Sequence, residues 1–248
     1  MNLLQRGLMV TLFLLIVWQC LVTLFKLPPY ILPTPLQIIS SLIQHAKLIS
    51  RELIPTLIET LLGLFFGIAL GMLLAISITL SRTLHTLMLP LLLASQALPL
   101  FAIAPLLIIW FGYGMTAKIL TTTLMLFFPI TNNFLDGLKQ TPQHYLDMAQ
   151  LMGSSRWQIL YQIRFPAALP NLASGIRLAT VMAPLGAIIG EWVGSSHGLG
   201  FLLLSANAQM QIDLMFAVLF VIILLSISIY FLVDKLLYLA TPWLFLKK

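Results

Sequence analysis

Few residues of this sequence could do chemistry, and those few are scattered along the chain. Ser196 and His197 stand together in GSSHGLG, residues 194–200, where a serine and a histidine would suggest a hydrolase. Adjacent side chains do not readily form a serine–base pair, because catalytic partners normally come from separate elements that converge in space. The flanking glycines suit a turn instead. We therefore predict no catalytic residue, and an intramembrane enzyme would need a convergent set that the sequence does not offer.

Metal and nucleotide binding are not predicted either. The only cysteine, Cys20, lies in an apolar run, and the four histidines are isolated, so no group has metal-ligand spacing. The pattern G-x-x-x-x-G-K-[ST] of phosphate-binding loops does not occur. We expect no cofactor and no ATP binding by this chain, so the energy for any work must come from a partner. The histidines are His45, His85, His144 and His197.

The composition is that of an integral membrane protein. Of the 248 residues, 60% are hydrophobic and 8% are charged, against about 25% charged in soluble domains. The apolar runs are long and do not alternate with polar residues, which favours helices over a β-barrel. The 13 Lys and Arg are scattered near the ends of apolar segments, a pattern of membrane orientation and not of nucleic-acid binding. We predict an all-α fold, a polytopic helical bundle in the lipid bilayer.

Apolar windows of roughly 20 residues with few charged side chains predict about six transmembrane helices in a single domain. Gly63, Gly67 and Gly71 recur at four-residue spacing in the second, where they would let a neighbouring helix approach closely. A short amphipathic helix at about 36–49 is expected along the membrane surface. The predicted spans are 8–25, 57–80, 86–110, 118–135, 173–193 and 214–234, with a polar loop at 136–172.

The third span has an unusual composition. Between Arg82 and Lys118 the chain has no charged residue, a stretch too long for one upright helix and too short for two spans with a loop. It also contains Pro90, Pro99 and Pro105. Proline frees backbone carbonyls, which membrane proteins turn toward other protein or toward a water-filled path. We expect a long or broken span, either a kinked packing helix or a pathway-lining one with Pro99 and Pro105 as candidates.

Glu191 is a carboxylate within the fifth predicted span. Such a group costs about 3 kcal/mol at mid-bilayer and less near the surface, so it needs a partner or water. It is a candidate pathway residue, or else an interfacial anchor beside Trp192. Glu59, near the end of the second span, has the same two interpretations.

Basic residues predict the orientation. With both termini in the cytoplasm, nine of the 13 Lys and Arg lie inside and four lie outside, as the positive-inside rule requires. The loop at 136–172 is then cytoplasmic. The inner residues are Arg6, Arg82, Lys139, Arg156, Arg164, Arg177, Lys235, Lys247 and Lys248, and the outer ones are Lys26, Lys47, Arg51 and Lys118.

The cytoplasmic loop should hold two short helices joined at a glycine. Tyr145, Met148, Ala149 and Met152 recur at the spacing of one helix face, and Gly153 is the residue type that ends helices. Ser154 or Ser155 can cap a second helix, which should run to Ile163 before Pro166 and Pro170. So many apolar residues in a polar loop indicate a partner surface. They include Trp157, Ile159, Leu160 and Tyr161.

The loop resembles that of the inner-membrane permease subunits of bacterial ATP-binding-cassette (ABC) importers. Their pattern is E-A-A, three residues, G, nine residues, I-x-L-P. The sequence keeps this spacing with Asp147-Met148-Ala149, then Gly153, then Ile163-Arg164-Phe165-Pro166. It departs from the pattern in having Asp for Glu, Met for the first Ala and Phe for Leu. The whole chain is similar to permeases for aliphatic sulfonates, taurine, nitrate and the pyrimidine precursor of thiamine. This likeness rests on three segments, ILPTPLQIISSL, ALPLFAIAPLLIIWFGYG and GEWVGSSHGLGFLLLSANAQMQIDLMFA.

The resemblance implies that the loop is a coupling helix, which fits a cleft on a separate ATPase and transmits its closure to the membrane helices. By position, Asp147, Ala149 and Gly153 would be the centre of this contact. The resemblance further implies two cytoplasmic ABC ATPase subunits, a second permease copy as a homodimer, and a periplasmic or lipoprotein substrate-binding protein, in a bacterial inner membrane. The other implied coupling residues are Met148, Met152, Ser154, Trp157, Ile163 and Pro166.

The function indicated is the permease of an importer for a small polar solute. The segment after the fifth span is most similar to permeases for the thiamine pyrimidine precursor. Aliphatic sulfonate, taurine and nitrate are alternative cargoes. A secondary transporter driven by an ion gradient is a further alternative, but it would require a midplane ion site and repeated halves.

Overall fold

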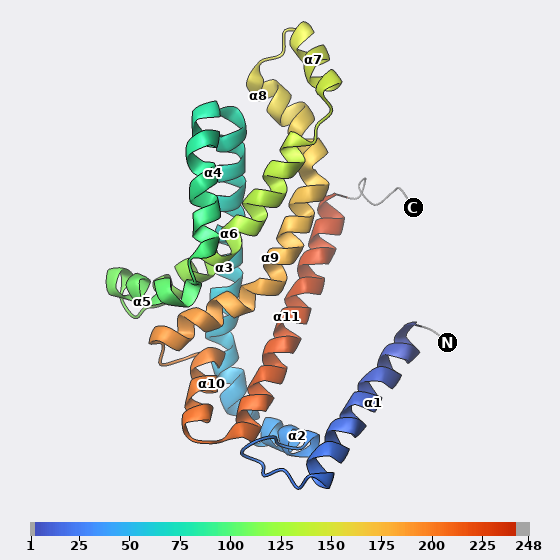
Figure 1. The fold of residues 1–248 in the computed structure, drawn as a ribbon, viewed down its shortest axis with the longest axis vertical. Coiled ribbons are helices and arrows are strands. Elements are labelled where there is room, and N and C mark those ends of the chain that lie inside the picture. Colours follow the sequence, from blue (N-terminus) through green and yellow to red (C-terminus); the bar gives the residue numbers. More distant parts are fainter. Residues whose placement is uncertain (1–2, 242–248) are drawn as a thin grey trace.

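The computed structural model describes residues 3–241, and all the regular secondary structure in that range is helical (Figure 1). The predicted all-α fold is confirmed. The long helices form an elongated bundle with α7 and α8 at one end and α2 and α10 at the other. In chain order the elements are α1 Leu3–Leu24, α2 Pro35–Gln44, α3 Ala46–Leu80, α4 Arg82–Ala97, α5 Leu100–Phe111, α6 Met115–Lys139, α7 Gln143–Leu151, α8 Arg156–Ile159, the π-helical turn η1 Leu160–Arg164, α9 Phe165–Gly194, α10 Leu199–Ala208 and α11 Ile212–Ala240.

By length and composition of the described residues, three helical stretches can cross a membrane: Ala46–Leu80, Arg156–Gly194 and Ile212–Ala240. A fourth crossing results if α4 and α5 form one bent span. α1 and α6 cover the first and fourth predicted spans but do not enter this count. The number of six therefore stays a prediction. So does the orientation of the termini, since Lys247 and Lys248 lie outside the described residues.

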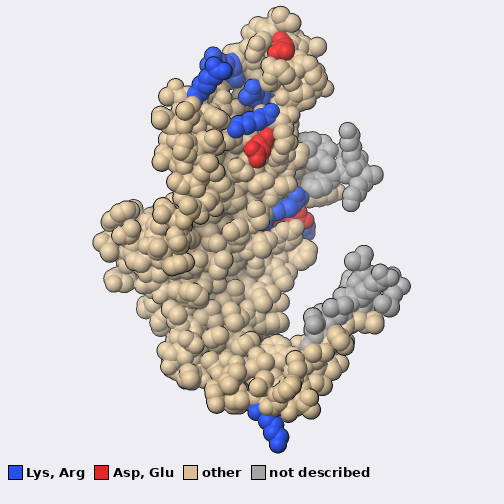
Figure 2. Space-filling model, in the orientation of Figure 1, with Lys and Arg blue, Asp and Glu red and all other residues tan. Residues whose placement is uncertain are grey.

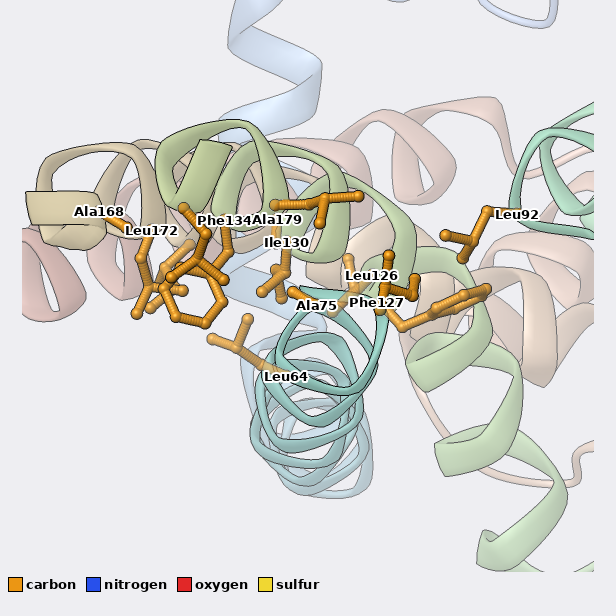
Figure 3. Packing of buried hydrophobic residues seen from close by; sticks show 14 of the residues in the cluster. Leu64, Ala75, Leu92, Leu126, Phe127, Ile130, Phe134, Ala168, Leu172 and Ala179 are labelled. Carbon is orange, nitrogen blue, oxygen red and sulfur yellow. The ribbon is translucent and has the colours of Figure 1, made fainter. Parts of the chain in front are cut away.

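α3, α6 and α9 pack around the main hydrophobic core. Figure 3 shows side chains of this core, with Leu64 and Ala75 from α3, Ile130 and Phe134 from α6, and Ala179 from α9 among those labelled. Phe134 and Ile130 are fully buried. The core fixes the relative positions of the three helices that carry both candidate sites described below.

The glycine stripe of α3 lies against α6, as its spacing predicts. A Cβ at Gly67 would lie 2.9 Å from the Cβ of Leu126, and one at Gly71 would lie 2.9 Å from the Cβ of Ile130. Real side chains do not approach so closely, so only glycine permits this distance between the two helix backbones. At Gly63 a Cβ would overlap the side chain of Thr122.

The third predicted span is broken. α4 runs back along α3, and α5 then turns away by 102° (Figure 1). Pro99 is the N-cap residue of α5, with φ −63° and ψ 122°. A proline there cannot continue the preceding helix, which explains the position of the bend. Pro90 and Pro105 lie inside α4 and α5.

The helix after the loop continues further than predicted. We expected it to end at Ile163, before Pro166 and Pro170, but α8, η1 and α9 form one continuous helical stretch that includes both prolines. In η1 the hydrogen bonds shift by one residue, with the Phe165 N–H donating to the carbonyl of Leu160. This wider turn directly precedes Pro166, whose ring would otherwise clash with a carbonyl one turn back. The loop is thereby joined to α9 by an unbroken helix.

Candidate functional site

The first candidate site is the projecting element formed by residues 142–164, which we call the knob (Figure 1). α7 begins directly after Pro142 and ends before Gly153, whose φ of +78° is favourable only for glycine. Ser155 then caps α8 through a capping box, since its hydroxyl accepts the N–H of Gln158 and its own N–H donates to the Gln158 side chain. The predicted first helix, the turn at Gly153 and the serine cap are confirmed, whereas the second helix is not short, because α8 continues into α9.

The knob has a small hydrophobic core of its own. Leu146, Ala149 and Ile159 are buried together, and Ile163 packs against them. Ala149 is only 6% exposed, so its side chain holds α7 against α8 and is not part of the outer surface. This core makes the knob stiff, because neither helix can tilt without opening it.

The outer face of the knob is apolar and unusually exposed. Met148, Met152 and Trp157, all predicted contact residues, are 62%, 79% and 65% exposed. Leu151, which the sequence argument did not single out, is 90% exposed, and Tyr161 is 76% exposed. Apolar side chains this exposed in a group usually mark a protein interface. The predicted apolar ridge is therefore present in part: Leu151 is added to it, whereas Ile159 and Leu160, which were predicted to belong to it, are buried in hydrophobic clusters.

The other predicted coupling residues lie on or near the knob. Asp147 is exposed, and its carboxylate accepts a hydrogen bond of 2.8 Å from the Gln143 amide. Gly153 and Pro166 are also exposed, whereas Ser154 is partly covered. The sequence spacing thus brings these residues to one end of the molecule.

The second candidate site is a buried polar cluster toward the opposite end, which the sequence analysis did not predict as a unit. Glu59 of α3 and Lys118 of α6 form an ion pair of 2.8 Å, with side chains 0% and 9% exposed. Lys118 was predicted to begin the fourth span on its outer side; it lies in the first turns of α6 and is buried. Gly190 of α9 makes room for it, since a Cβ there would lie 3.0 Å from the Cα of Lys118.

Glu191 forms the centre of the same cluster. Its carboxylate accepts hydrogen bonds from the Thr56 hydroxyl, at 2.6 Å, and from the N–H of Gly200, at 2.5 Å. The Thr56 oxygen also accepts the N–H of Leu199, at 2.8 Å. Glu191 is 1% exposed and therefore bonds to groups of its own chain.

A third carboxylate completes the arrangement. Glu52 of α3 accepts the N–H of Gly198 at 2.8 Å and pairs with Arg51 at 2.8 Å. The first N–H groups of a helix have no partner within it and favour negative charge. Glu52, Thr56 and Glu191 supply these partners for α10, so they fasten its start to α3 and α9.

A signal for this cluster was present in the sequence. Glu52, Thr56 and Glu59 recur at the spacing of one helix face within an apolar segment, and carboxylates there require partners. The partners could not be identified from the sequence, because they are distant along the chain. Lys118 is 59 residues from Glu59, and Glu191 is 135 residues from Thr56.

The segment GSSHGLG forms the turn that we expected. The Ser195 hydroxyl donates to the carbonyl of His197 and accepts its N–H, so it bonds to the turn itself. Gly198, with φ +106°, directs the chain into α10. In the described residues, no group of three or more His, Cys, Asp and Glu side chains could hold a metal ion.

The profile of one family, described as the binding-protein-dependent transport system inner membrane component, matches residues 67–244. The chain belongs to this family. This permease is 46% identical over 235 residues to a "Probable ABC transporter permease protein" of Haemophilus influenzae, covering 95% of this chain and 96% of that one. It is 35% identical to the "Formylaminopyrimidine transport permease protein ThiX" of Halalkalibacterium halodurans, with 94% and 93% covered. It is 39% identical to the "Riboflavin transport system permease protein RibX" of Chloroflexus aurantiacus, with 96% and 90% covered.

Solved structures agree on the fold. The MetNI methionine ABC transporter in an inward-facing conformation matches with a TM-score of 0.67 at 21% identity, over 78% of this permease and 96% of that chain. The permease is thus a multi-pass membrane subunit of an ABC importer. It is not an enzyme, and ATP hydrolysis belongs to a separate subunit. Family membership favours the importer hypothesis over the ion-coupled transporter and over the intramembrane enzyme.

Proposed function

We propose that the permease encloses the pathway of an importer with a second copy of itself and that the knob receives the movement of two cytoplasmic ATPase subunits. The observation that carries this proposal is the exposed apolar face of Met148, Leu151, Met152 and Trp157 on a stiff, projecting element. The residues of the knob that contact the ATPase in this proposal are Asp147, Met148, Leu151, Met152, Gly153, Ser154 and Trp157. Ala149 and Ile163 support this surface from the core of the knob, and Pro166 supports it from the start of α9.

The continuous helix behind the knob provides a path for the movement. α9 has 30 residues, which corresponds to about 45 Å at 1.5 Å per residue. The knob lies at one of its ends and Glu191 at the other, where hydrogen bonds join α9 to α3 and α10. A displacement of the knob is therefore carried along α9 to the far side of the membrane. ATP binding by the partner would in this way bias a two-state arrangement of the helices.

In this proposal both termini and the knob are cytoplasmic, in a bacterial inner membrane. A periplasmic or lipoprotein binding protein delivers the cargo at the end formed by α2 and α10. The broken span with Pro99 and Pro105 borders the pathway, because a bent, proline-containing segment is where membrane proteins expose backbone carbonyls to a cavity. Glu191 controls the pathway through its bonds to α10, and it contributes to the pathway surface only when those bonds open.

The cargo that we propose is a small polar solute, the pyrimidine precursor of thiamine. This choice of cargo is supported by a relative named for formylaminopyrimidine transport, to which 94% of the chain is similar. The relative named for riboflavin is comparably similar, so riboflavin is the principal alternative, and taurine and aliphatic sulfonates follow. The test is isothermal titration of the cognate binding protein with formylaminopyrimidine, riboflavin and taurine. Binding of riboflavin or taurine in preference to the pyrimidine would refute this assignment.

Disulfide cross-linking tests the coupling role. In a permease with Cys20→Ser, single cysteines at Met148 and Met152 are paired with cysteines around the expected cleft of the co-expressed ATPase. We expect oxidation to link both positions to the ATPase, and nucleotide to change the yield. A cysteine at Trp110, an exposed residue of α5, is the matched control and should not link. Equal yields at all three positions, or none at the knob, would contradict the proposal.

A further inference from the structure

Behind the knob lies a pocket that the coupling role does not use. It has a volume of about 360 Å³ and is bordered by the end of α3, the start of α4, the inner side of α7, and the segment α8–η1. Three of its lining residues are arginines, Arg82, Arg156 and Arg164, and none is a carboxylate. We call it the arginine pocket.

The three guanidinium groups lack an acidic partner within the described part of the chain. No ion pair joins Arg82, Arg156 or Arg164 to a described Asp or Glu, although such pairs form elsewhere. The two carboxylates on neighbouring elements bond to amides instead: Asp136 accepts from Asn132 and Asp147 accepts from Gln143. Three positive charges therefore converge without compensation.

Arg164 gives the strongest indication of a missing ligand. It is held on η1 immediately before α9, and its Nε is buried with no hydrogen-bond partner. A buried, unpaired donor of a charged group is costly, so native proteins satisfy it with a ligand, a partner or water. The guanidinium fork matches the oxygens of a phosphate in two parallel hydrogen bonds.

The position of the pocket indicates where the phosphate comes from. Thr79 and Leu80, in its wall, are the last residues but one and the last of the membrane-crossing helix α3. The second span predicted from the sequence, 57–80, ends at these same residues, so the pocket falls at the predicted boundary of the hydrocarbon layer, where phospholipid headgroups lie. Figure 2 shows Lys and Arg gathered at this end, with single carboxylates nearby, one mixed group of both signs near the middle of this face and one basic group at the opposite end. The lining is mixed, with Leu146 and Leu160 beside the arginines, as suits an amphiphile.

We infer that the arginine pocket binds the phosphate of an anionic phospholipid headgroup. Basic pockets between membrane helices at the cytoplasmic boundary are typical sites for such headgroups. The pocket favours a lipid with net negative charge over a zwitterionic one. Its lining offers three guanidinium groups to one phosphate and contains no carboxylate that could bind the cationic group of a zwitterionic lipid. The bound lipid would tie the start of α4 to the knob. The inference does not rest on the proposed coupling role.

Lipid exchange in nanodiscs tests the inference. The full-length permease is purified, freed of native lipid, and placed in phosphatidylcholine nanodiscs that contain a small fraction of fluorescent phosphatidylglycerol. We expect binding of phosphatidylglycerol about tenfold tighter than of equally labelled phosphatidylcholine, and Arg164→Gln should remove about that factor. Because Arg164 is partly buried, the exposed pair Arg82→Gln with Arg156→Gln serves as a second variant and should weaken binding at least as much.

Lys139→Gln is the matched control, because it removes one positive charge at the same end of the molecule without lining the pocket. It should leave the binding unchanged. The inference is overturned if wild type shows no preference for phosphatidylglycerol, or if Lys139→Gln loses as much as the pocket variants. It is also overturned if inorganic phosphate fully displaces the lipid, which indicates a soluble ligand. Complete displacement by the ATPase subunit would equally overturn it, since the arginines then serve acidic side chains of that protein.

Discussion

Replacing Lys118 by methionine tests the buried ion pair directly. The Nζ of Lys118 lies 2.8 Å from a carboxylate oxygen of Glu59, and both side chains are almost fully enclosed between α3, α6 and α9. Methionine keeps the length and apolar stem of lysine but removes its charge. Glu59 would then be a buried carboxylate without a cation, and its second oxygen already lacks a hydrogen-bond partner.

The expected loss of stability is large. Removing one member of a buried pair costs about 3–5 kcal/mol, because the remaining charge is uncompensated in a medium of low polarity. Replacing both members by apolar residues of similar volume is often neutral or stabilising. We therefore expect Lys118→Met to lower the free energy of unfolding by about 3 kcal/mol or more, and Glu59→Met combined with Lys118→Met to restore it to within about 1 kcal/mol of wild type.

The assay is unfolding of the detergent-solubilised permease with increasing mole fraction of sodium dodecyl sulfate, followed by circular dichroism. Lys139→Met, on the same helix but exposed, is the control and should change the stability little. Our reasoning would be refuted if Lys118→Met were as stable as the control. It would also be refuted if the double variant were as unstable as the sum of the two single ones, because no coupling would then exist between the two side chains.

Three further predictions concern packing, backbone and hydrogen bonding. Gly67→Leu should destabilise the bundle by about 1–3 kcal/mol, because the new side chain would force α3 and α6 apart. Gly114→Leu is the control, since a Cβ at Gly114 would meet open space and should not destabilise the bundle. Thermal unfolding of the two variants in detergent measures the difference. Gly153→Ala should strain the turn of the knob by about 1 kcal/mol and speed amide exchange in α7; unchanged exchange would contradict this expectation. Thr56→Val should lower the free energy of unfolding by about 1–3 kcal/mol, because the carboxylate of Glu191 loses a hydrogen-bond donor. Thr56→Ser keeps the hydroxyl and should retain most of the wild-type stability. Equal melting temperatures for the Val and Ser variants would disprove the role of the hydroxyl.

The knob was accessible to sequence reasoning because its structure is local. The helix face of Met148 and Met152, the turn at Gly153 and the cap near Ser155 are all determined within a few residues. The exposure of Leu151 was not, since it depends on which side of α7 packs against Ile159. The run through Pro166 was missed for a related reason: a π-helical turn depends on small shifts in hydrogen bonding that residue types alone do not specify.

The buried polar cluster was not accessible in the same way. Glu59 and Glu191 each indicated a need for a partner, but several polar residues could have met it. Only the packing of α3 against α6, at the distance that Gly67 permits, brings Lys118 to Glu59. Likewise, Thr56 reaches Glu191 because α9 crosses α3 near the start of α10.

By itself, the sequence determined the membrane environment, the helical class and the short helix with its glycine turn in this permease. Apolar length requires helices in a bilayer, and a short amphipathic segment with a glycine turn can be recognised from its own residues. The tertiary structure decided which ionisable groups pair and which arginines around Arg164 converge on one pocket. Such pairings join residues far apart in the chain, and their geometry follows from how closely the helices pack, which no local pattern encodes.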